Sequence, residues 1–270
     1  MKILIAGGSG FIGTYLYGYL SKSHDVHRTF NHSLIEGGIH YNIVENEFNE
    51  IATQKYDIII NNINPLALPY QYVVKSISDI VNKCKNDNSW LINVSSIFAD
   101  EQNKLNDAYS LKKHIADEII IGEMKGHKYT SLRFPQIFDY ARLAKKSQAG
   151  LYYFIDAVRN REKIMLFANC RDVARNYFSV ELLLDAIKYT IENSISGLHN
   201  VFVPAHTLNL KEIVALIAGM NGGYDAESMI QQSEKEGITY HIPLVSVAFA
   251  QWYTGASDFS YYLSKAYHFE

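Results

Sequence analysis

A short apolar run that leads directly into closely spaced glycines constrains this chain more than any other feature. Lys2–Ala6 predicts a buried strand, and Gly7-Gly8-Ser9-Gly10-Phe11-Ile12-Gly13 then opens a stretch with helical character. Glycines placed this way permit a tight turn and let the backbone approach a pyrophosphate, which the first N–H groups of the helix attract. This context favours a dinucleotide site over an ordinary glycine turn. Its predicted contacts are Gly7, Gly10, Phe11, Ile12 and Gly13.

Short apolar runs alternate with longer amphipathic ones over the first half of the chain, which is typical of βαβ units around a parallel sheet. The predicted strands are Lys2–Ala6, Asp25–Phe30, Ile39–Ile43, Asp57–Asn61, Trp90–Ser95 and Tyr129–Arg133. The predicted helices are Gly10–Ser21, Leu68–Lys85, Ala108–Gly122, Leu151–Arg159, Val180–Glu192 and Leu210–Met220. In the helix at Ala108–Gly122, the residues Leu111, Ile115, Ile119 and Gly122 follow a helical spacing.

The predicted fold class is α/β, a doubly wound parallel-sheet Rossmann fold with a small C-terminal α/β substrate-binding part. Residues 1–135 would form the dinucleotide-binding core, and residues 136–270 mainly the substrate-binding part, with some segments returning to the core. A chain of 270 residues suits one large α/β domain with or without a small companion.

The charge and cysteine content narrow the class of partner. A formal net charge of −3 gives no attraction to nucleic acid or to an anionic membrane. Cys84 and Cys170 lack metal-ligand spacing and fit a reducing compartment. No stretch approaches the roughly 20 apolar residues of a membrane span, and the first apolar run is too short for a signal peptide. We therefore expect a cytoplasmic protein without a metal site that acts on a small molecule.

A tyrosine and a lysine follow a strand that ends in two hydroxyls. Ser95 and Ser96 close the predicted strand, and Tyr109 and Lys113 share a helical face because they are four positions apart. A nearby ammonium favours the phenolate and lowers the pKa of a tyrosine from its ordinary value of about 10. The pattern predicts proton transfer by Tyr109. Because neighbouring strand residues point to opposite sides, one of the two serines faces the substrate, and we favour Ser96.

The glycine loop, the strand-end serines and the Tyr-x-x-x-Lys pair together resemble the short-chain dehydrogenase/reductase superfamily. The resemblance is closer to its extended branch, the NAD-dependent epimerase/dehydratase family of nucleotide-sugar enzymes. Further similar stretches are Leu132–Phe138, Arg175–Val180 and Gly197–Val201, so that the resemblance runs from residue 2 to about 220.

The resemblance implies roles for residues along the chain. Ser96, Arg175 and Tyr177 would contact the substrate, the arginine at its diphosphate, and Tyr109 and Lys113 would also touch the cofactor. Pro135 and Gln136 would lie near the nicotinamide, and Asn42 and Ile43 near adenine, although the family's aspartate is absent there. Asn61 and Asn62 would bond either the backbone or the cofactor ribose.

The segment after the second predicted strand bears on the choice of cofactor. It lacks the carboxylate that usually holds an adenosine ribose diol. Arg28, Asn31, His32 and Ser33 would instead receive a 2′-phosphate. The sequence therefore favours NADP(H) over NAD(H).

The residues around the tyrosine also bear on the reaction. Ile97 and Phe98 stand where dehydratases of the family carry an acidic pair, which disfavours dehydration. Only 13 positions separate Ser96 from Tyr109, fewer than is usual in the extended branch. We expect an NAD(P)-dependent oxidoreductase that reduces a nucleotide-activated 4-keto-6-deoxy sugar. The alternatives are a nucleotide-sugar 4-epimerase and a non-catalytic redox sensor, against which Tyr109 and Lys113 argue.

Two of the predicted helices are expected to pair with a second copy of the chain. Members of the resembling family commonly form homodimers through the helices that correspond to Leu68–Lys85 and Ala108–Gly122. The first of these helices has apolar residues for both core and partner. They are Val73, Val74, Ile77, Ile80 and Val81.

Overall fold

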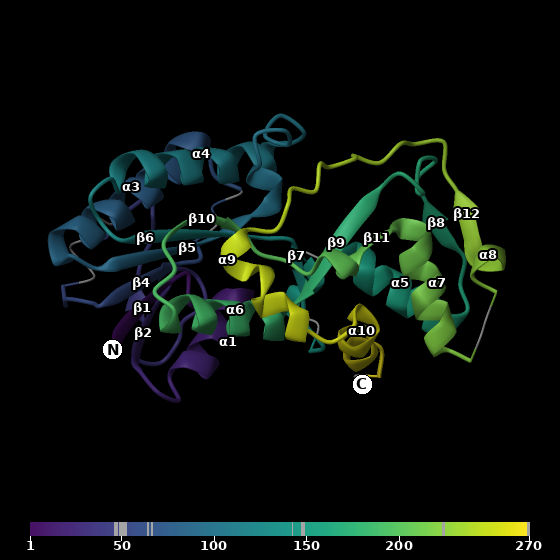
Figure 1. Cartoon of the computed structure of the whole chain (residues 1–270), viewed down its shortest axis with the longest axis horizontal. Coiled ribbons are helices and arrows are strands. Elements are labelled where there is room, and N and C mark those ends of the chain that lie inside the picture. The colour runs from purple at the N-terminus through teal and green to yellow at the C-terminus, as the bar shows by residue number, and fades with distance from the viewer. Residues whose placement is uncertain are drawn as a thin grey trace. The chain divides into compact units, whose positions relative to one another are not determined.

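The computed structural model describes residues 1–45, 48, 53–63, 65, 67–141, 143–146, 149–222 and 225–268. The chain divides into two compact units (Figure 1). Unit 1 consists of Met1–Phe134 and Leu184–Val201, and unit 2 consists of Pro135–Leu183 and Phe202–Glu270.

Unit 1 is built on a seven-stranded sheet in the order β10-β6-β5-β4-β1-β2-β3, with every pairing parallel. The strands are β1 (Lys2–Ala6), β2 (Asp25–Phe30), β3 (Ile39–His40), β4 (Ile58–Asn61), β5 (Trp90–Ser96), β6 (Tyr129–Phe134) and β10 (Gly197–Asn200). The chain adds strands to one side of β1 and then to the other, so the order reverses between β1 and β4. In open α/β sheets ligands bind at such a reversal, beyond the carboxyl ends of the strands.

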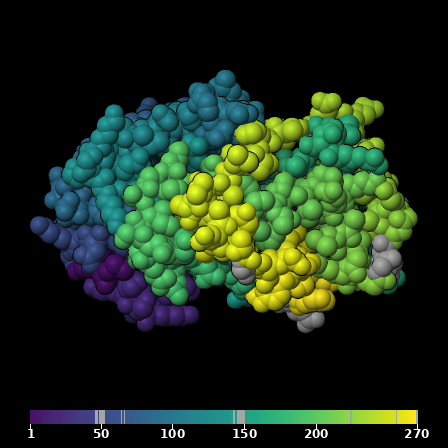
Figure 2. All heavy atoms as spheres, in the orientation of Figure 1, coloured from purple at the N-terminus to yellow at the C-terminus, as the bar shows by residue number. Residues whose placement is uncertain are grey.

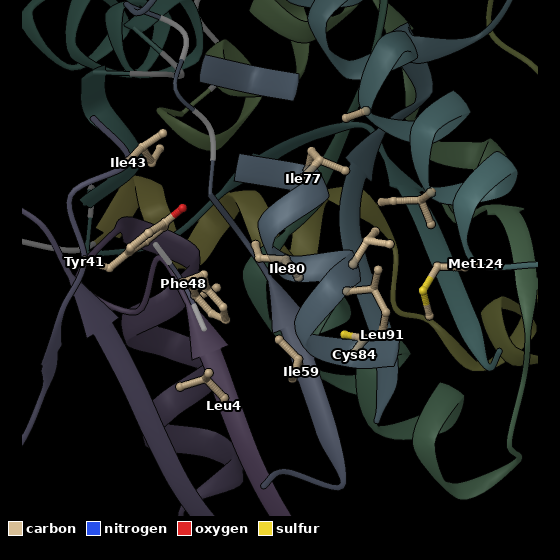
Figure 3. Close-up of a cluster of buried hydrophobic side chains, with 14 of the residues drawn as sticks. Leu4, Tyr41, Ile43, Phe48, Ile59, Ile77, Ile80, Cys84, Leu91 and Met124 are labelled. Carbon is tan, nitrogen blue, oxygen red and sulfur yellow. The ribbon is translucent and has the colours of Figure 1, made fainter. Parts of the chain in front are cut away.

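Helices cover both faces of this sheet, with α3 and α4 on one face and α1 and α6 on the other (Figure 1). Their bounds are α1 (Phe11–Leu20), α3 (Tyr70–Asp87), α4 (Ala108–Glu123) and α6 (Val180–Glu192), and a 3-10 turn, η1 (Ile97–Ala99), follows β5. Because both faces are covered, the central strands read as continuous apolar runs. A core cluster between the sheet and α3 contains Leu4, Ile59, Ile77, Ile80 and Leu91 (Figure 3). Each such fully buried side chain contributes about 1.5–3 kcal/mol to folding.

Unit 2 has two smaller sheets. One is three-stranded, in the order β11-β9-β7, and the other pairs β12 with β8. The strands are β7 (Gln136–Phe138), β8 (Ile164–Leu166), β9 (Ala174–Ser179), β11 (Thr207–Asn209) and β12 (Ile230–Gln232). The helices are α5 (Ala149–Asn160), α7 (Leu210–Met220), α8 (Ala226–Met229), α9 (Val247–Ala250) and α10 (Phe259–His268), with 3-10 turns η2 (Leu143–Lys146), η3 (Pro204–His206) and η4 (Trp252–Gly255).

The tyrosine-rich C-terminal segment, yellow in Figure 2, contributes both surface and core to unit 2. Phe259, Leu263 and Ala266 of α10 are buried, whereas Val247 of α9 is 91% exposed. Lys265 of α10 donates to the carboxylate of Glu181 at 2.8 Å. The helix thus packs by an apolar stripe, as its spacing predicts.

The predicted fold class is confirmed, but the strand predicted at Ile39–Ile43 is wrong beyond His40. The side-chain oxygen of Asn42 accepts the N–H of Val44 at 3.0 Å, and this local turn ends the strand. Tyr41 and Ile43 then pack into the core cluster (Figure 3). Among the described residues, no helix combines the length and the apolarity needed to cross a membrane.

Candidate functional site

The glycine loop between β1 and α1 is packed so closely that side chains would not fit at Gly7, Gly8 or Gly13. Gly7 has φ +82°, and a Cβ on it would lie 2.9 Å from the carbonyl oxygen of Asn62. A Cβ on Gly13 would lie 2.3 Å from the carbonyl oxygen of Gly7. Gly10 is the N-cap of α1, so no side chain caps the first turn. The N–H groups of Phe11, Ile12 and Gly13 have no acceptor within the helix, and this fits the phosphates of a dinucleotide.

The two asparagines at the end of β4 bond protein atoms. The amide of Asn61 donates to the side-chain oxygen of Asn93 at 2.8 Å, and its oxygen accepts the N–H of Ile63 at 3.1 Å. The amide of Asn62 donates to the carbonyl of Gly7 at 3.5 Å. These bonds hold the loop after β4 beside the glycine loop. Two roles were predicted for these asparagines, a bond to the backbone or a bond to the cofactor ribose. The structure shows their hydrogen bonds to other protein atoms.

The end of β2 lies against the same loop. The Cβ of Arg28 stands 2.4 Å from where a Cβ on Gly8 would lie, and its guanidinium lies 3.8 Å from the ring centroid of Tyr17. Thr29 accepts the N–H of Gly7 at 2.9 Å. Arg28 therefore lies beside the glycine loop, as a role in cofactor binding requires.

The other residues predicted to surround the adenosine differ in their surroundings. Asn31 and His32 have side-chain nitrogens 3.4 Å apart, and His32 and Ser33 are exposed. Asn42 uses its side chain in the turn that ends β3, and Ile43 is only 7% exposed within the core cluster. The side chain of Ile43 is therefore buried and not exposed for the predicted contact with adenine.

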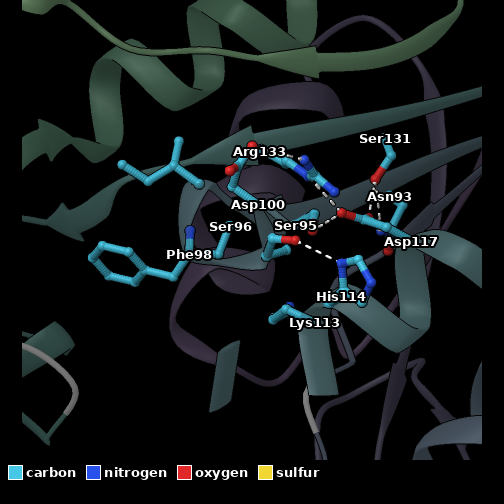
Figure 4. A network of polar contacts seen from close by, with 12 residues as sticks. Asn93, Ser95, Ser96, Phe98, Asp100, Lys113, His114, Asp117, Ser131 and Arg133 are labelled. Atoms are coloured by element: carbon cyan, nitrogen blue, oxygen red, sulfur yellow. Dashed lines mark hydrogen bonds and ion pairs between the residues drawn. The ribbon is translucent and has the colours of Figure 1, made fainter. Parts of the chain in front are cut away.

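Tyr109 and Ser96 meet at the carboxyl end of β5. Tyr109 lies in the first turn of α4, whose N-cap Asp107 accepts the N–H of Ser110 at 2.7 Å. Its phenol is hydrogen-bonded to the side chain of Ser96, and the Ser96 oxygen also accepts the N–H of Phe98 at 3.2 Å. The hydroxyl of Ser95 donates to Asp117 at 3.0 Å instead (Figure 4). The structure therefore brings Ser96, and not Ser95, to the tyrosine.

Lys113 lies one helical turn after Tyr109, and its ammonium donates to the carbonyl of Val94 on β5 at 3.0 Å. Burial lowers the pKa of Lys113 to about 8, while the nearby Asp117 acts in the opposite direction. For Tyr109, burial raises the pKa above its ordinary value, and the hydrogen bond from Ser96 counteracts only part of this. The lowered tyrosine pKa expected from the sequence is therefore wrong, because desolvation outweighs the effects that favour the phenolate.

Two further predicted residues, Gln136 and Tyr177, lie in one sheet of unit 2, and Pro135 directly precedes it. Pro135 is buried, and Gln136 on β7 pairs in register with Tyr177 on β9. The side-chain oxygen of Gln136 is buried without a hydrogen-bond partner. Tyr177 is 4% exposed, its ring is stacked on Phe259, and burial raises the pKa of Tyr177 to about 12.

Arg175, two residues before Tyr177 on β9, is held within unit 2. Its guanidinium donates to the carbonyls of Ala174 at 2.8 Å and Ile238 at 2.9 Å. It also lies 5.0 Å from the ring centroid of Tyr240, and burial lowers the pKa of Arg175. Among the described residues, no group of histidine, cysteine, aspartate and glutamate is placed to hold a metal ion.

Sequence reasoning missed a buried polar network behind the tyrosine and lysine. Its centre is Asp117, which follows Lys113 by one helical turn, and Arg133 lies beside it on β6 (Figure 4). Two signals were present in the sequence. Tyr109, Lys113 and Asp117 repeat every four positions, and Ser131 and Arg133 share one face of the strand Tyr129–Phe134.

No protein-family model and no curated protein sequence matches this chain. Solved structures do match. The UDP-glucose 4-epimerase of Thermotoga maritima is 15% identical with a TM-score of 0.81, over 100% of this chain and 98% of that one. The dTDP-glucose 4,6-dehydratase of Bacillus anthracis is 17% identical with a TM-score of 0.81, over 100% and 96%. The ADP-L-glycero-D-manno-heptose-6-epimerase of Helicobacter pylori is 16% identical with a TM-score of 0.77, over 98% and 94%.

The likeness extends over both units of the chain. It confirms, at the level of fold, the resemblance seen in the sequence. The chain has the fold of these epimerases and of the dehydratase, and its Tyr109, Lys113 and Ser96 lie at the carboxyl edge of the parallel sheet, where open α/β sheets bind ligands.

Proposed function

We propose that this chain is an NAD(P)-dependent oxidoreductase of the extended short-chain dehydrogenase/reductase family that acts on a nucleotide-activated sugar. The observation that carries the proposal is the hydrogen bond between Tyr109 and Ser96, with Lys113 one turn further along the same helix. The glycine loop opens at the same edge of the sheet. Two proteins of the same fold support the ligand classes, an epimerase solved with UDP-glucose and a dehydratase solved with NAD.

The residues of unit 1 fit a nicotinamide dinucleotide, and each has a separate proposed role towards the cofactor or the substrate. When bound, the cofactor supplies or removes the two electrons at a sugar carbon. The first turn of α1 would hold the pyrophosphate of the cofactor, and the ammonium of Lys113 would hold its ribose hydroxyls. Ser96 donates a hydrogen bond to the substrate oxygen as charge develops there, and Tyr109 exchanges a proton with that oxygen.

The direction we propose is reduction of a 4-keto-6-deoxy sugar. Burial raises the pKa of Tyr109, so its phenol stays protonated near neutral pH and is ready to donate to a ketone oxygen. Elimination of water is disfavoured because Ile97 and Phe98, which follow Ser96, are apolar and buried. The next carboxylate along the chain, Asp100, lies 3.8 Å from Arg133.

A second candidate is a 4-epimerase, because several proteins of the same fold carry that name, including the UDP-glucose 4-epimerase of Thermus thermophilus solved with NAD. An epimerase uses the same tyrosine twice and keeps its cofactor bound through the cycle. Nicotinamide absorbance that persists through purification would favour the epimerase, and free exchange of added NADPH would favour the reductase.

The decisive experiment is a thermal-shift panel of nucleotide sugars, with and without nicotinamide cofactor. A specific ligand at a hundred times its dissociation constant stabilises the folded state by about 2.7 kcal/mol. We expect a sugar nucleotide to raise the melting temperature further in the presence of cofactor. If the cofactor alone raises the melting temperature and no nucleotide sugar of the panel is turned over, the chain is a dinucleotide-binding redox sensor and not an enzyme.

We also propose a homodimer through α3 and α4. The structure changes which apolar residues are available for the contact. Of the apolar residues counted for it on α3, only Val74 is exposed, at 42%, and the others lie in the core of unit 1. On α4, the partly exposed residues Leu111, Ile115 and Ile119 add apolar surface. Light scattering that shows a monomer at working concentration would contradict the dimer.

A further inference from the structure

A carboxylate with no exposed surface lies behind the tyrosine and lysine of unit 1. Asp117 of α4 is 0% exposed and accepts hydrogen bonds from four side chains on β5 and β6 (Figure 4). The donors and distances are Ser131 at 2.6 Å, Arg133 at 2.7 Å, Ser95 at 3.0 Å and Asn93 at 3.3 Å. A charge this deeply buried is strongly unfavourable unless it is paired and fully hydrogen-bonded. The network meets both conditions.

The same carboxylate lies one helical turn from Lys113, and both residues hold β5. Lys113 donates to the carbonyl of Val94, while Asp117 accepts from the side chains before and after it, Asn93 and Ser95. The next residue of the strand is Ser96, whose side chain meets Tyr109. The position of α4 against the strand end, and with it the contact between Ser96 and Tyr109, depends on these bonds.

We propose that Asp117 is a positioning residue of this site: its buried carboxylate fixes α4 on β5 so that Ser96 meets Tyr109, and its charge keeps Lys113 protonated. The catalytic meaning of this role rests on the function proposed above. Ser95 then has a structural role, because its hydroxyl donates one of the hydrogen bonds that hold the carboxylate of Asp117.

Several other charged groups near α4 have partners other than Lys113. Arg133, the cation of the network, also lies 3.8 Å from Asp100, and Glu101 lies 3.6 Å from His114. On α3, Lys75 pairs with Asp79 and Lys83 pairs with Asp87. Lys112, next to Lys113, donates to the carbonyl of Leu68. Asp117 is the charged residue that acts on Lys113.

The first test measures the ionisation of Lys113 directly, by NMR titration of the protein with labelled lysine side chains. The signal of Lys113 is assigned by its absence in Lys113→Arg. In Asp117→Asn we expect the pKa of Lys113 to fall by about one unit or more, because a nearby opposite charge is lost. Glu118→Gln is the matched control, since it removes an exposed carboxylate one position along the helix. It should leave the titration unchanged.

Because Asp117→Asn leaves Arg133 buried with less compensation, a second variant protects the test from misfolding. Asp117→Asn combined with Arg133→Met removes both charges and keeps the network neutral and of similar volume. We expect this variant to fold and still to show the lowered pKa of Lys113. An unchanged Lys113 titration in either folded variant would overturn the proposal.

Kinetics test the positioning. With an identified substrate, Asp117→Asn should lower kcat tenfold or more and move the alkaline limb of the pH profile of cofactor binding to lower pH. Asp117→Glu, which restores the charge, should recover part of the loss. A kcat and profile equal to the parent in Asp117→Asn would refute the positioning role. If no nucleotide sugar is turned over by the parent, the proposed function fails, while the titration of Lys113 still decides the electrostatic role of Asp117.

Discussion

The polar groups at the end of β5 and those on the β7–β9 sheet of unit 2 are treated differently by the fold. In unit 1, the buried carboxylate of Asp117 has four donors, and Ser96 and Tyr109 bond each other. In unit 2, the side-chain oxygens of Gln136 and Asn176 are buried without a hydrogen-bond partner. Native proteins leave few such groups, so those that occur call for an explanation. This local difference supports the proposal that the end of β5 carries the chemistry and that the β7–β9 sheet carries groups for recognition.

The substitution Tyr109→Phe is the strongest test of the chemistry proposed for unit 1. The change keeps the ring but removes the hydroxyl that exchanges a proton with the substrate. We expect turnover to fall about a hundredfold to ten-thousandfold while the affinity for cofactor changes little. Steady-state rates and cofactor titration by fluorescence measure the two effects. Full activity in this variant would assign the proton transfer to another group and would favour the sensor.

Lys113→Ala should damage both turnover and cofactor binding. The ammonium is proposed to hydrogen-bond the ribose of the cofactor, so we expect a loss of about a hundredfold in kcat/KM together with weaker cofactor binding. Isothermal titration with NADPH and NADH measures the binding. An unchanged cofactor affinity would limit Lys113 to a structural bond with Val94.

The pH dependence of cofactor binding sharpens the same assignment. Burial lowers the pKa of Lys113 to about 8, so its charged form is complete well below pH 8 and is lost as the pH rises through that value. Cofactor affinity should therefore be constant towards pH 6 and decline above about pH 8. Lys113→Ala should abolish this decline. A decline that persists in the variant would come from another group.

Much of unit 1 could be predicted because its signals are local. β1, β2 and α6 have the predicted bounds, as does α7 in unit 2, since glycine, turn residues and apolar periodicity mark their ends. The buried face of α4 could not be predicted in this way. Apolar spacing points to Leu111, Ile115 and Ile119, which are only partly buried, whereas Asp117 and Ser110 are fully buried. Asp117 is held in the core by partners on β5 and β6, and a helical period does not reveal those partners.

The candidate site shows the same limit. The choice of Ser96 over Ser95 follows from strand alternation and stays a prediction, while in the structure the hydroxyl of Ser95 donates to Asp117. The shift in the pKa of Tyr109 had the wrong sign, because the charge of Lys113 is visible in the sequence and the extent of desolvation is not. Desolvation depends on how the whole unit packs around the phenol.

On the side of unit 2, Arg175→Ala tests recognition without chemistry. If Arg175 binds the diphosphate of the substrate, its loss should raise KM for the sugar nucleotide about tenfold and change kcat less, because a hydrogen bond to a charged group contributes about 1.5–3 kcal/mol. Arg171→Ala is the matched control, since Arg171 is an exposed arginine that precedes the same strand. Equal effects of the two substitutions would show that Arg175 does not bind the substrate and only donates to the carbonyls of Ala174 and Ile238.

The smallest effect is expected at the far end of the cofactor, where Arg28 is proposed to favour NADPH over NADH. The guanidinium is partly exposed and lies over the ring of Tyr17, beside the glycine loop. A partly solvated charge contributes about 0–1 kcal/mol, so Arg28→Ala should reduce the preference for NADPH by no more than about fivefold and leave NADH binding as it was. The ratio of the two dissociation constants, measured at low and high salt, checks this, because a contact between charges weakens as salt screens it. Arg161→Ala, at an exposed arginine of unit 2, is the control. Tighter binding of NADH than of NADPH by the parent protein would refute the cofactor preference, and a salt-independent ratio would remove Arg28 from it.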